Sequence, residues 1–519
     1  MVNEAATIVF RADAGLHIGS GHVMRCLSLA AALRVLGGRS HFVCRAHDGH
    51  LGALVEAQGH ALHLLPRGEA SADHWLGADW TTDAAQTLQA IDGLRPDWLV
   101  VDHYGLDARW EQRVGAAAGQ CLAIDDLADR PHVAALLLDQ SLQSRPGRYA
   151  GRLGGARTLL GPRYALLRPE FAARREARAA RDGRLRQLLA TAGGIDQTDL
   201  LGKVVQAWAG LPDAQRPALA LVVGRDSPNL DALRALAAHH PGCALHVQTD
   251  RMAELIDAAD LMVTAAGSVN WERCCLGVPA LLYATAPNQA DNFVQLARAR
   301  TAIALGDATA LDIVTLRRTL ARLALRPSLL WRLSHRAAAL VDGHGALRVA
   351  VTMQAARLSL RLATPADAEM AWHWRNHEST RRQSINTDTI PLDAHRAWWQ
   401  ASLARRDRSL LIARIGAMPV GVLRLDHEGQ DSTVSIHLDP KLTGLGLGPR
   451  LLRWGRDWLR RRRPGPQRLL AVIRPDNLAS ARAFAAAGFH RRVADGLWVC
   501  ETEPTPKPAM QRDPAHDQD

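Results

Sequence analysis

The sequence has no long hydrophobic run and few cysteines. Because no stretch of about 18 or more apolar residues occurs, we expect no transmembrane helix and no membrane partner. The amino-terminal residues also lack the basic region and apolar stretch of a secretory signal peptide. Seven cysteines, an odd number with no C-x-x-C motif, fit a reducing compartment. We therefore expect a cytoplasmic protein.

Acidic residues are fewer than basic ones. The sequence has 63 lysines and arginines but 52 aspartates and glutamates, which gives a net charge of +11. Such an excess can mark a nucleic-acid-binding protein. The arginines are scattered, however, apart from the run at residues 460–463. Solvated helix faces explain the charge better than a nucleic-acid patch, so we expect no nucleic acid; anionic substrates such as nucleotides would also benefit from it. The length of 519 residues is enough for about three domains.

The most informative stretch lies near the amino terminus, where an apolar run at residues 7–10 leads through a glycine-rich turn into a helical pattern at 22–36. A strand, a glycine-rich turn and a helix are typical of the start of nucleotide-binding α/β domains. The turn contains neither G-x-G-x-x-G nor G-K-[ST], which excludes a dinucleotide fingerprint and a Walker A loop. Its glycines, Gly15, Gly19 and Gly21, allow a close approach of the backbone and present amides at a helix start.

His22 is the candidate general base. It lies in the first turn of the predicted helix, where the positive end of the helix dipole disfavours an imidazolium and keeps the ring neutral. Asp13, at the end of the strand, could orient the imidazole or stabilise its charged form. A capping or packing role for His22 is the alternative, since histidine is common at helix starts. His17 and His22 have no usual zinc spacing, and we expect no metal.

Residues 7–165 alternate strand and helix patterns, and several strands are apolar throughout, as in a parallel sheet covered on both faces. The strand candidates are residues 7–10, 40–44, 61–65, 98–102, 121–124 and 135–138. Functional loops are expected after the carboxyl ends of such strands. Two of those ends carry polar clusters, for which a role in turns or caps is the alternative. These clusters are Asp102-His103-Tyr104 and Asp125-Asp126.

A polar, arginine-rich segment at residues 172–186 connects this region to a second α/β unit. Its strand candidates are residues 186–192, 218–223, 244–248, 261–264 and 279–283. Gly267 and Ser268 form a small-residue turn between a strand and a helix, and Glu272 lies one turn into that helix. This is a phosphate-sized nest beside a carboxylate. Two α/β domains with a cleft between them, the second holding a nucleotide, suggest the GT-B architecture.

A third domain is expected from about residue 358, after an Arg-, Leu- and Ala-rich helical stretch at 307–356. Its strand candidates alternate with few helices, which gives an α+β pattern; they are residues 358–363, 410–415, 420–425 and 433–438. A glycine-rich turn with Gly444, Gly446 and Gly448 then leads into a helix and would offer backbone amides to a pyrophosphate. The polar, proline-rich tail at 503–519 is expected to be disordered.

An ordered set of segments runs through the first two α/β units. It consists of Arg11-Ala12-Asp13 and residues 18–26, 101–105, 161–168, 192–196, 266–272 and 288–289. This set resembles a family of UDP-2,4-diacetamido-2,4,6-trideoxy-β-L-altropyranose hydrolases, which act in pseudaminic acid biosynthesis. The resemblance implies a GT-B-type, metal-independent hydrolase whose catalytic histidine is His22. It also implies a site for the UDP-sugar made from Arg11, Gly19, Gly21, Asp102, His103, Tyr104, Gly193, Gly267, Ser268, Glu272, Asn288 and Gln289.

The third domain carries Gly444, Gly446 and Gly448, followed by Asn477 and Ser480. In this order they resemble the acetyl-CoA pyrophosphate loop and a later segment of GNAT acetyltransferases. The resemblance implies acetyl-CoA as co-substrate, bound by these residues. The segment 374–398 is similar to the N-acetyltransferase that acts one step before the hydrolase in the same pathway.

Two positions depart from the GNAT pattern. The usual Gln or Arg at the start of the loop is Thr443, and the tyrosine that commonly protonates the CoA thiolate falls at Phe484. Backbone amides can still bind pyrophosphate at this loop. The proton donor must then be another group or water.

The expected fold is therefore two Rossmann-like domains in a GT-B arrangement, 1–170 and 171–350, followed by an α+β GNAT domain at 357–502. We expect a bifunctional enzyme that acetylates the 4-amino group of a UDP-linked 4-amino-4,6-dideoxy sugar and then cleaves UDP from the diacetamido product. A GT-B glycosyltransferase fused to an acetyltransferase is the alternative. A nucleotide-sugar sensor without catalysis is a third interpretation, and the oligomeric state stays open.

Overall fold

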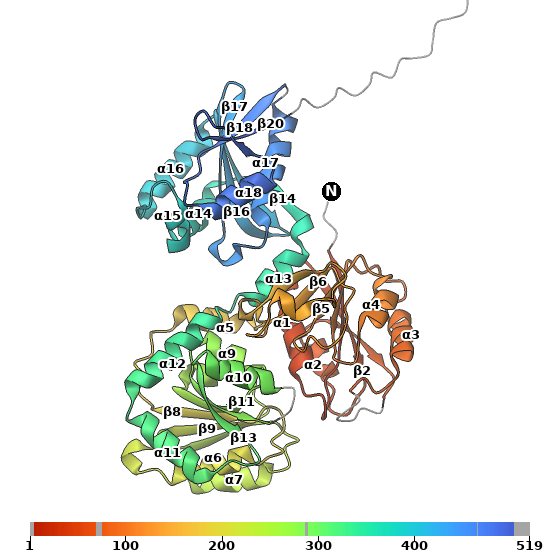
Figure 1. Ribbon diagram of the computed structural model, residues 1–519, viewed down its shortest axis with the longest axis vertical. Coiled ribbons are helices and arrows are strands. Elements are labelled where there is room, and N and C mark those ends of the chain that lie inside the picture. Colours follow the sequence, from red (N-terminus) through yellow and green to blue (C-terminus); the bar gives the residue numbers. More distant parts are fainter. Residues whose placement is uncertain (1–4, 69–74, 286–288, 464, 503–519) are drawn as a thin grey trace, which may run out of the picture. The chain divides into compact units, whose positions relative to one another are not determined.

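The computed structural model describes residues 5–68, 75–285, 289–463 and 465–502 (Figure 1). Asn288 and the predicted tail at 503–519 lie outside these ranges. The chain divides into two compact units, Met1–Ala350 and Val351–Asp519. No helix in the described ranges is long and apolar enough to cross a membrane.

The first lobe, built on strands β1 to β7, is a parallel sheet in the order β3-β2-β1-β4-β5-β6-β7. Its strands are β1 (Thr7–Ala12), β2 (Arg39–Arg45), β3 (Ala61–Leu65), β4 (Trp98–Asp102), β5 (Gln120–Ile124), β6 (Leu136–Asp139) and β7 (Arg157–Leu160). Its helices are α1 (Gly21–Val35), α2 (Gly52–Ala57), α3 (Trp80–Ala90) and α4 (Ala108–Gly115). Strands β1 and β4 are buried along almost their whole length, as predicted for a sheet covered on both faces.

The second lobe, built on strands β8 to β13, is a parallel sheet in the order β10-β9-β8-β11-β12-β13. Its strands are β8 (Gln187–Thr191), β9 (Ala218–Val223), β10 (Cys243–Val247), β11 (Leu261–Ala265), β12 (Ala280–Ala284) and β13 (Ala302–Asp307). Successive side chains of a strand point to opposite faces. Leu188 and Val263 therefore belong to one core cluster, whereas Leu189 and Met262 belong to another.

Helices cover both faces of this second sheet. Trp208 of α6 (Leu200–Ala209) and Leu320 of α11 (Ile313–Ala324) pack into the first cluster. Phe171 of α5 (Pro169–Ala177) and Leu296 of α10 (Ala290–Arg298) pack into the second. The remaining helices of the unit are α7 (Leu230–His239), α8 (Met252–Ala258), α9 (Val269–Cys275), α12 (Pro327–Leu340) and α13 (Gly345–Met353).

The unit Val351–Asp519 contains a mixed sheet in the order β14-β15-β16-β17-β18-β20-β19. Its strands are β14 (Leu358–Leu362), β15 (Arg408–Ile415), β16 (Met418–Glu428), β17 (Asp431–Leu438), β18 (Gln467–Ala471), β19 (His490–Arg491) and β20 (Trp498–Thr502). Its helices are α14 (Ala368–Asn376), α15 (Glu378–Gln383), α16 (Leu392–Ala404), α17 (Leu447–Arg462) and α18 (Leu478–Ala486). The parallel pairing of β17 with β18 spans only residues 431–433, so the rest of β17 extends beyond it and leads into the loop at Gly444.

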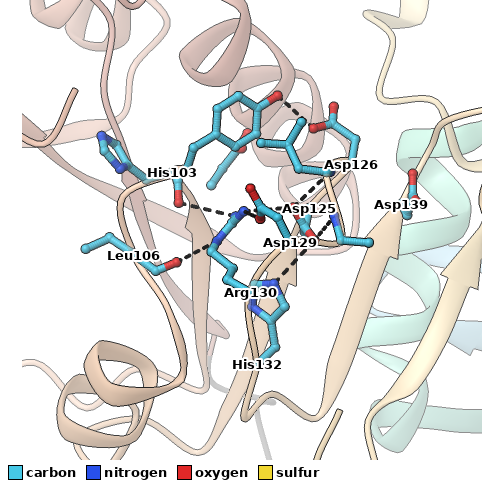
Figure 2. A network of polar contacts seen from close by, with 12 residues as sticks. His103, Leu106, Asp125, Asp126, Asp129, Arg130, His132 and Asp139 are labelled. Atoms are coloured by element: carbon cyan, nitrogen blue, oxygen red, sulfur yellow. Dashed lines mark hydrogen bonds and ion pairs between the residues drawn. The ribbon is translucent and has the colours of Figure 1, made fainter. Parts of the chain in front are cut away.

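A buried ionic network holds the loops that follow β4 and β5 in the first lobe (Figure 2). Arg130 is its centre. Its Nε donates to the Leu106 carbonyl at 2.8 Å, and its Nη1 lies 3.0 Å from the Asp125 carboxylate. The network therefore fixes the backbone next to Tyr104 and Asp126, two residues of the predicted polar clusters.

His132 extends this network between two carboxylates. Its Nδ1 lies 2.6 Å from Glu111 Oε1, and its Nε2 lies 3.4 Å from Asp125 Oδ2. Burial alone would lower the pKa of His132, but the two carboxylates outweigh it and raise the pKa from 6.5 to about 9. The imidazolium form therefore prevails in the folded state near neutral pH.

This raised pKa predicts a loss of stability at alkaline pH. A group whose pKa is higher in the folded state stabilises fully below its unfolded value and loses that contribution as the pH rises through the folded value, here about 9. One pKa unit corresponds to about 1.4 kcal/mol, so the loss in unfolding free energy is at most about 3 kcal/mol. Urea unfolding followed by circular dichroism, from about pH 6 to about pH 10, should show the decline in the wild type.

The variant Glu111→Gln removes one of the two charges on His132 and should show a shallower decline over the same pH range. Glu56→Gln, which changes an exposed glutamate of the same lobe, is the matched control. An equally steep decline in Glu111→Gln would show that His132 does not carry the pH dependence.

Candidate functional site

A cavity of about 260 Å³ is lined by loops of both lobes. The first lobe contributes the start of α1 and the loops after β4, β5 and β6; the second contributes the turns after β8 and β11 and the start of α10. The two sides approach closely, since a Cβ atom placed on Gly21 would lie 3.8 Å from Ser268 Oγ. The lining includes His22, Arg25, Trp75, Tyr104, Asp126, Gln140, Gly193, Gly267, Ser268 and Gln289.

His22 lies in the first turn of α1, as predicted, and its ring is held from one side. Nδ1 donates to Oδ1 of Asp102 at 2.7 Å, which leaves Nε2 for the cavity that His22 lines. Strand register explains the pair. Asp102 ends β4 directly opposite Ala12 of β1, so it lies beside the turn that leads into α1.

Arg25 lies three residues beyond His22, on the same face of α1, and pairs with the same carboxylate. Its Nε and Nη2 donate to the two oxygens of Asp102 at 2.6 and 2.5 Å, and its Nη1 lies 3.0 Å from Asp126. Burial alone would raise the pKa of Asp102, but the charge of Arg25, followed by that of His22, holds it well below its usual range. Asp102 is therefore an ionised, fixed acceptor for His22.

The prediction that Asp13 orients His22 is wrong. Asp13 Oδ1 accepts from Arg11 Nη1 at 2.6 Å and from the backbone N–H of Arg45 at 2.7 Å, so this carboxylate faces β2. Its Oδ2 lies 3.5 Å from His103 Nε2. Arg11, Asp13 and His103 are buried behind the cavity and, like Gly19, do not line it. The structure therefore does not bring these four residues to the cavity as substrate-binding groups.

Tyr104 and Trp75 form an aromatic wall next to His22. The ring centres of His22 and Tyr104 are 4.8 Å apart with the rings nearly perpendicular, and Trp75 lies 5.3 Å from Tyr104. The Tyr104 hydroxyl donates to Asp126 at 2.7 Å. Tyr104 is a predicted site residue, whereas Arg25 and Trp75 are not predicted. Only Arg25 carries a sequence signal, its i+3 spacing from His22 on a helix.

The second lobe presents the turn after β11 to the cavity, as predicted. Gly267 and Ser268 line it, and α9 begins at the next residue. Asn270 shapes the turn, because its side-chain amide donates to the carbonyls of Ala265 and Gly267 at 2.8 and 2.9 Å. Glu272 does not line the cavity, and burial raises its pKa to about 7. Two further predicted residues of this lobe do line it, Gly193 and Gln289.

The unit Val351–Asp519 carries a second candidate site at the start of α17. Gly444 and Gly446 adopt left-handed backbone angles, with φ of 78° and 79°, and Gly446 immediately precedes the helix. Gly448 lies in the first turn, where a Cβ atom would be 3.4 Å from Ala483 of α18. The turn brings backbone amides to a helix N-terminus, which is an anion-binding arrangement.

Other residues predicted for acetyl-CoA are used within the fold. Asn477 caps α18, because its Oδ1 accepts from the backbone N–H of Ser480 at 3.0 Å and its Nδ2 donates to the Gln383 carbonyl at 3.1 Å. Phe484 is buried, and its ring centre lies 4.9 Å from that of Phe489. The roles of Asn477 and Ser480 in binding acetyl-CoA stay predictions, and Phe484 is a core residue.

Residues 357–490 match the family model described as an acetyltransferase (GNAT) domain. The spore coat polysaccharide biosynthesis protein SpsG of Bacillus subtilis is 31% identical over 201 residues, which cover 39% of this chain and 59% of that protein. The UDP-2,4-diacetamido-2,4,6-trideoxy-β-L-altropyranose hydrolase of Campylobacter jejuni is 23% identical over 264 residues, 50% of this chain and 85% of that protein. The crystal structure of Acinetobacter baumannii MurG has a TM-score of 0.48 at 16% identity and covers 67% of this chain and 99% of that one.

The chain combines a GT-B-type α/β region with a GNAT acetyltransferase domain. Two parallel sheets with a cavity between their loops define the first part, and the matched domain model defines the second. The GT-B-type region is similar to the Campylobacter jejuni hydrolase and to SpsG, and a GNAT domain follows it in the same chain. The chain spans 59% of the length of SpsG. The predicted fold class is confirmed, and the GNAT match supports acetyl-CoA as a co-substrate.

The geometry of the glycine turn predicts that Gly446→Val impairs acetyl-CoA binding. A β-branched side chain is strained at a φ of 79°, so the backbone must move away from the conformation that presents its amides. We expect the Kd for acetyl-CoA, measured by calorimetry, to rise at least about tenfold, which is about 1.4 kcal/mol.

Gly429→Val is the matched control, because Gly429 also has a positive φ and open surroundings but lies in the hairpin between β16 and β17. It should leave the Kd unchanged. Equal losses of affinity in the two variants would mean that strain in the domain, rather than the turn at Gly446, weakens binding.

Proposed function

We propose that this chain is a bifunctional nucleotide-sugar enzyme of pseudaminic acid biosynthesis. The GNAT domain transfers an acetyl group from acetyl-CoA to the 4-amino group of a UDP-linked 4-amino-4,6-dideoxy sugar. The GT-B-type region then hydrolyses the bond between the diacetamido sugar and UDP. The similarity to the Campylobacter jejuni hydrolase and the GNAT match support the two activities.

The observation that carries the proposal is the His22–Asp102 pair at the wall of the cavity. With Nδ1 bound to an ionised carboxylate, the neutral ring has its lone pair on Nε2. In the proposed reaction, Nε2 takes a proton from a water whose oxygen attacks the anomeric carbon. The bond from that carbon to the diphosphate oxygen breaks, and UDP leaves with the bonding electrons. Asp102 stabilises the imidazolium that forms, and Arg25 keeps Asp102 ionised.

The turn after β11 is suited to bind the UDP that leaves in the reaction. Gly267 and Ser268 line the cavity at the start of α9, where backbone amides can donate to phosphate oxygens. Gly21 faces this turn from the first lobe, so the scissile bond of a substrate held there lies within reach of the turn that carries His22.

Release of UDP distinguishes the proposed hydrolase from a glycosyltransferase on the same type of fold. The purified full-length chain is incubated with the UDP-linked diacetamido sugar and no acceptor. UDP and free sugar appear in equal amounts if water is the acceptor. UDP release that depends on an added sugar acceptor would support the glycosyltransferase instead.

Removing His22 should slow hydrolysis strongly. Loss of a general base typically costs about 10²–10⁴-fold, so His22→Gln should lower kcat by that factor with little change in KM or in the melting temperature. Asp102→Asn should also lower kcat, because an amide cannot stabilise the imidazolium as a carboxylate does. Steady-state assays of UDP release give both values.

His17→Gln is the control, because His17 is an exposed histidine of the same turn and does not line the cavity. A His22→Gln variant with near wild-type kcat would remove His22 from the mechanism. In the part of the chain that the structure describes, no group of three or more His, Cys, Asp or Glu side chains could hold a metal ion. We therefore also predict that EDTA leaves hydrolysis unchanged.

Changes in the turn after β11 should weaken UDP binding. A Cβ on Gly267 would meet nothing closer than 3.8 Å, so Gly267→Leu can fold while its side chain obstructs phosphates. We expect Gly267→Leu to raise the Kd for UDP at least about tenfold, which is about 1.4 kcal/mol, as measured by calorimetry. Gly154→Leu in an open loop of the first lobe is the control. A Kd for UDP that Gly267→Leu leaves unchanged would put the nucleotide elsewhere.

A further inference from the structure

Gln140 lines the cavity between the two lobes and has no role in the proposed hydrolysis. It directly follows β6, and only 4% of its surface is exposed. A buried amide normally has hydrogen-bond partners at both of its ends, because an unpaired polar group loses its bonds to water without replacement. The partners of the two ends therefore indicate what Gln140 does.

One end of this amide is held by the protein. Its Oε1 accepts a hydrogen bond from the backbone N–H of Leu166 at 3.0 Å. Since a backbone N–H can only donate, the oxygen must face Leu166, and the Nε2 amino group faces another way. Nε2 has no hydrogen-bond partner among the described residues, and the side chain lines the cavity. Gln140 therefore offers N–H donors to a ligand.

The backbone on both sides of this hydrogen bond is fixed. Asp139, which precedes Gln140, accepts from the Tyr149 hydroxyl at 3.0 Å. The segment that carries Leu166 packs tightly against Gly345, where a Cβ atom would come within 2.2 Å of the carbonyl oxygen that precedes Leu166. The position and direction of Nε2 are therefore set before any ligand binds, which lowers the entropic cost of binding.

The charged and phenolic donors of the first lobe at this cavity are occupied within the protein. Arg25 donates to Asp102 and Asp126, and the Tyr104 hydroxyl donates to Asp126 as well. Gln140 remains as a neutral donor, and an uncharged carbonyl oxygen suits it as a partner. An acetamido group of the sugar carries such an oxygen. The 4-ammonium group of the precursor sugar has only donors.

The place of Gln140 along the sheet favours the acetamido group at C4. Asp102 ends β4 and orients His22, which acts at the anomeric carbon in the proposed reaction. Gln140 follows β6, and β5 lies between β4 and β6. Neighbouring strands are about 4.8 Å apart, so the ends of β4 and β6 are about 10 Å apart. C2 is bonded to the anomeric carbon, whereas C4 lies across the ring, so the group at C4 extends further from the reacting atom.

We propose that Gln140 is a specificity-determining residue of the hydrolase site and that its Nε2 donates to the carbonyl oxygen of the 4-acetamido group. This inference rests on the proposed function, in which hydrolysis follows acetylation of the 4-amine. An ammonium group at C4 would place donors against Nε2 and would lose part of its hydration without a new partner. The hydrolase site therefore selects the acetylated sugar over its amine precursor.

The test measures UDP release by the full-length chain from two substrates, the UDP-linked diacetamido sugar and its UDP-linked 4-amino precursor. Acetyl-CoA is left out, and the assay is run at about pH 7, where a glutamate side chain is ionised and an amine is protonated. Gln140→Glu keeps the acceptor for Leu166 but presents a carboxylate oxygen to the sugar. The ratio of kcat/KM for the diacetamido substrate to kcat/KM for the amine should fall at least about 30-fold, because one hydrogen bond is lost and a charge-assisted one is gained. Gln140→Leu, which removes the donor, should lower kcat/KM for the diacetamido substrate about tenfold.

Gln89→Glu is the matched control, because it introduces the same charge at an exposed residue of α3 that does not line the cavity. It should leave kcat/KM for both substrates unchanged. Equal losses with the two substrates in Gln140→Glu would overturn the proposal, because they indicate a structural role or recognition of the 2-acetamido group that both substrates share. A wild type that hydrolyses both substrates equally well would overturn it as well.

Failure of the proposed function has a different signature. If the wild type releases no UDP from either substrate, hydrolysis is wrong, and Gln140 is judged on the Kd values of the two UDP-sugars, measured by calorimetry. Only the difference between the wild type and Gln140→Glu is compared, so binding elsewhere in the chain cancels. A shift of the Kd ratio toward the amine in Gln140→Glu supports the proposal, and an unchanged ratio overturns it.

Discussion

The buried carboxylate of Asp102 is the constraint on which the first site depends. A carboxylate at this depth is costly unless it is paired, and Arg25 supplies the pairing with two hydrogen bonds. Without that cation, burial would favour the protonated acid, and His22 would lose an ionised acceptor. The main role of the Arg25–Asp102 ion pair is therefore to orient the imidazole of His22, and its contribution to stability is secondary. The same guanidinium reaches Asp126, so the cavity wall and the histidine are positioned together.

The interior strands could be predicted from the sequence because burial on both faces makes them continuous apolar runs. The predicted ranges 98–102 and 218–223 coincide with the interior strands β4 and β9. The strands that the pattern misses carry polar residues or lie at sheet edges. Both β7, with sequence RTLL, and β13, which is mostly accessible, are edge strands. A half-exposed edge has no continuous apolar signal, and its pairing is decided by the neighbouring strand.

Residues of the site could be predicted only where they lie close together in the sequence. His22 follows from a strand, a glycine turn and a helix within one stretch of chain. The carboxylate that pairs with His22 could not be predicted in this way, because Asp13 is closer to His22 in the sequence whereas Asp102 is closer in space. That choice depends on the pairing of β1 with β4, which sets Asp102 opposite Ala12. Trp75 and Gln140 reach the cavity from loops, and no spacing rule in the sequence connects them to His22.

In the proposed function, both sites hold phosphates on backbone amides at helix starts, at Gly267–Ser268 and at Gly444–Gly448. Such amides recognise a phosphate whatever is attached to it, which is why Thr443 can replace a longer side chain at the second turn. Backbone amides alone therefore do not distinguish one phosphorylated ligand from another. Discrimination must then come from side chains whose hydrogen bonds are fixed in direction by the fold. The Arg25–Asp102–His22 set has this property in the first site, since its hydrogen bonds within the protein fix the His22 ring and leave Nε2 open toward the cavity.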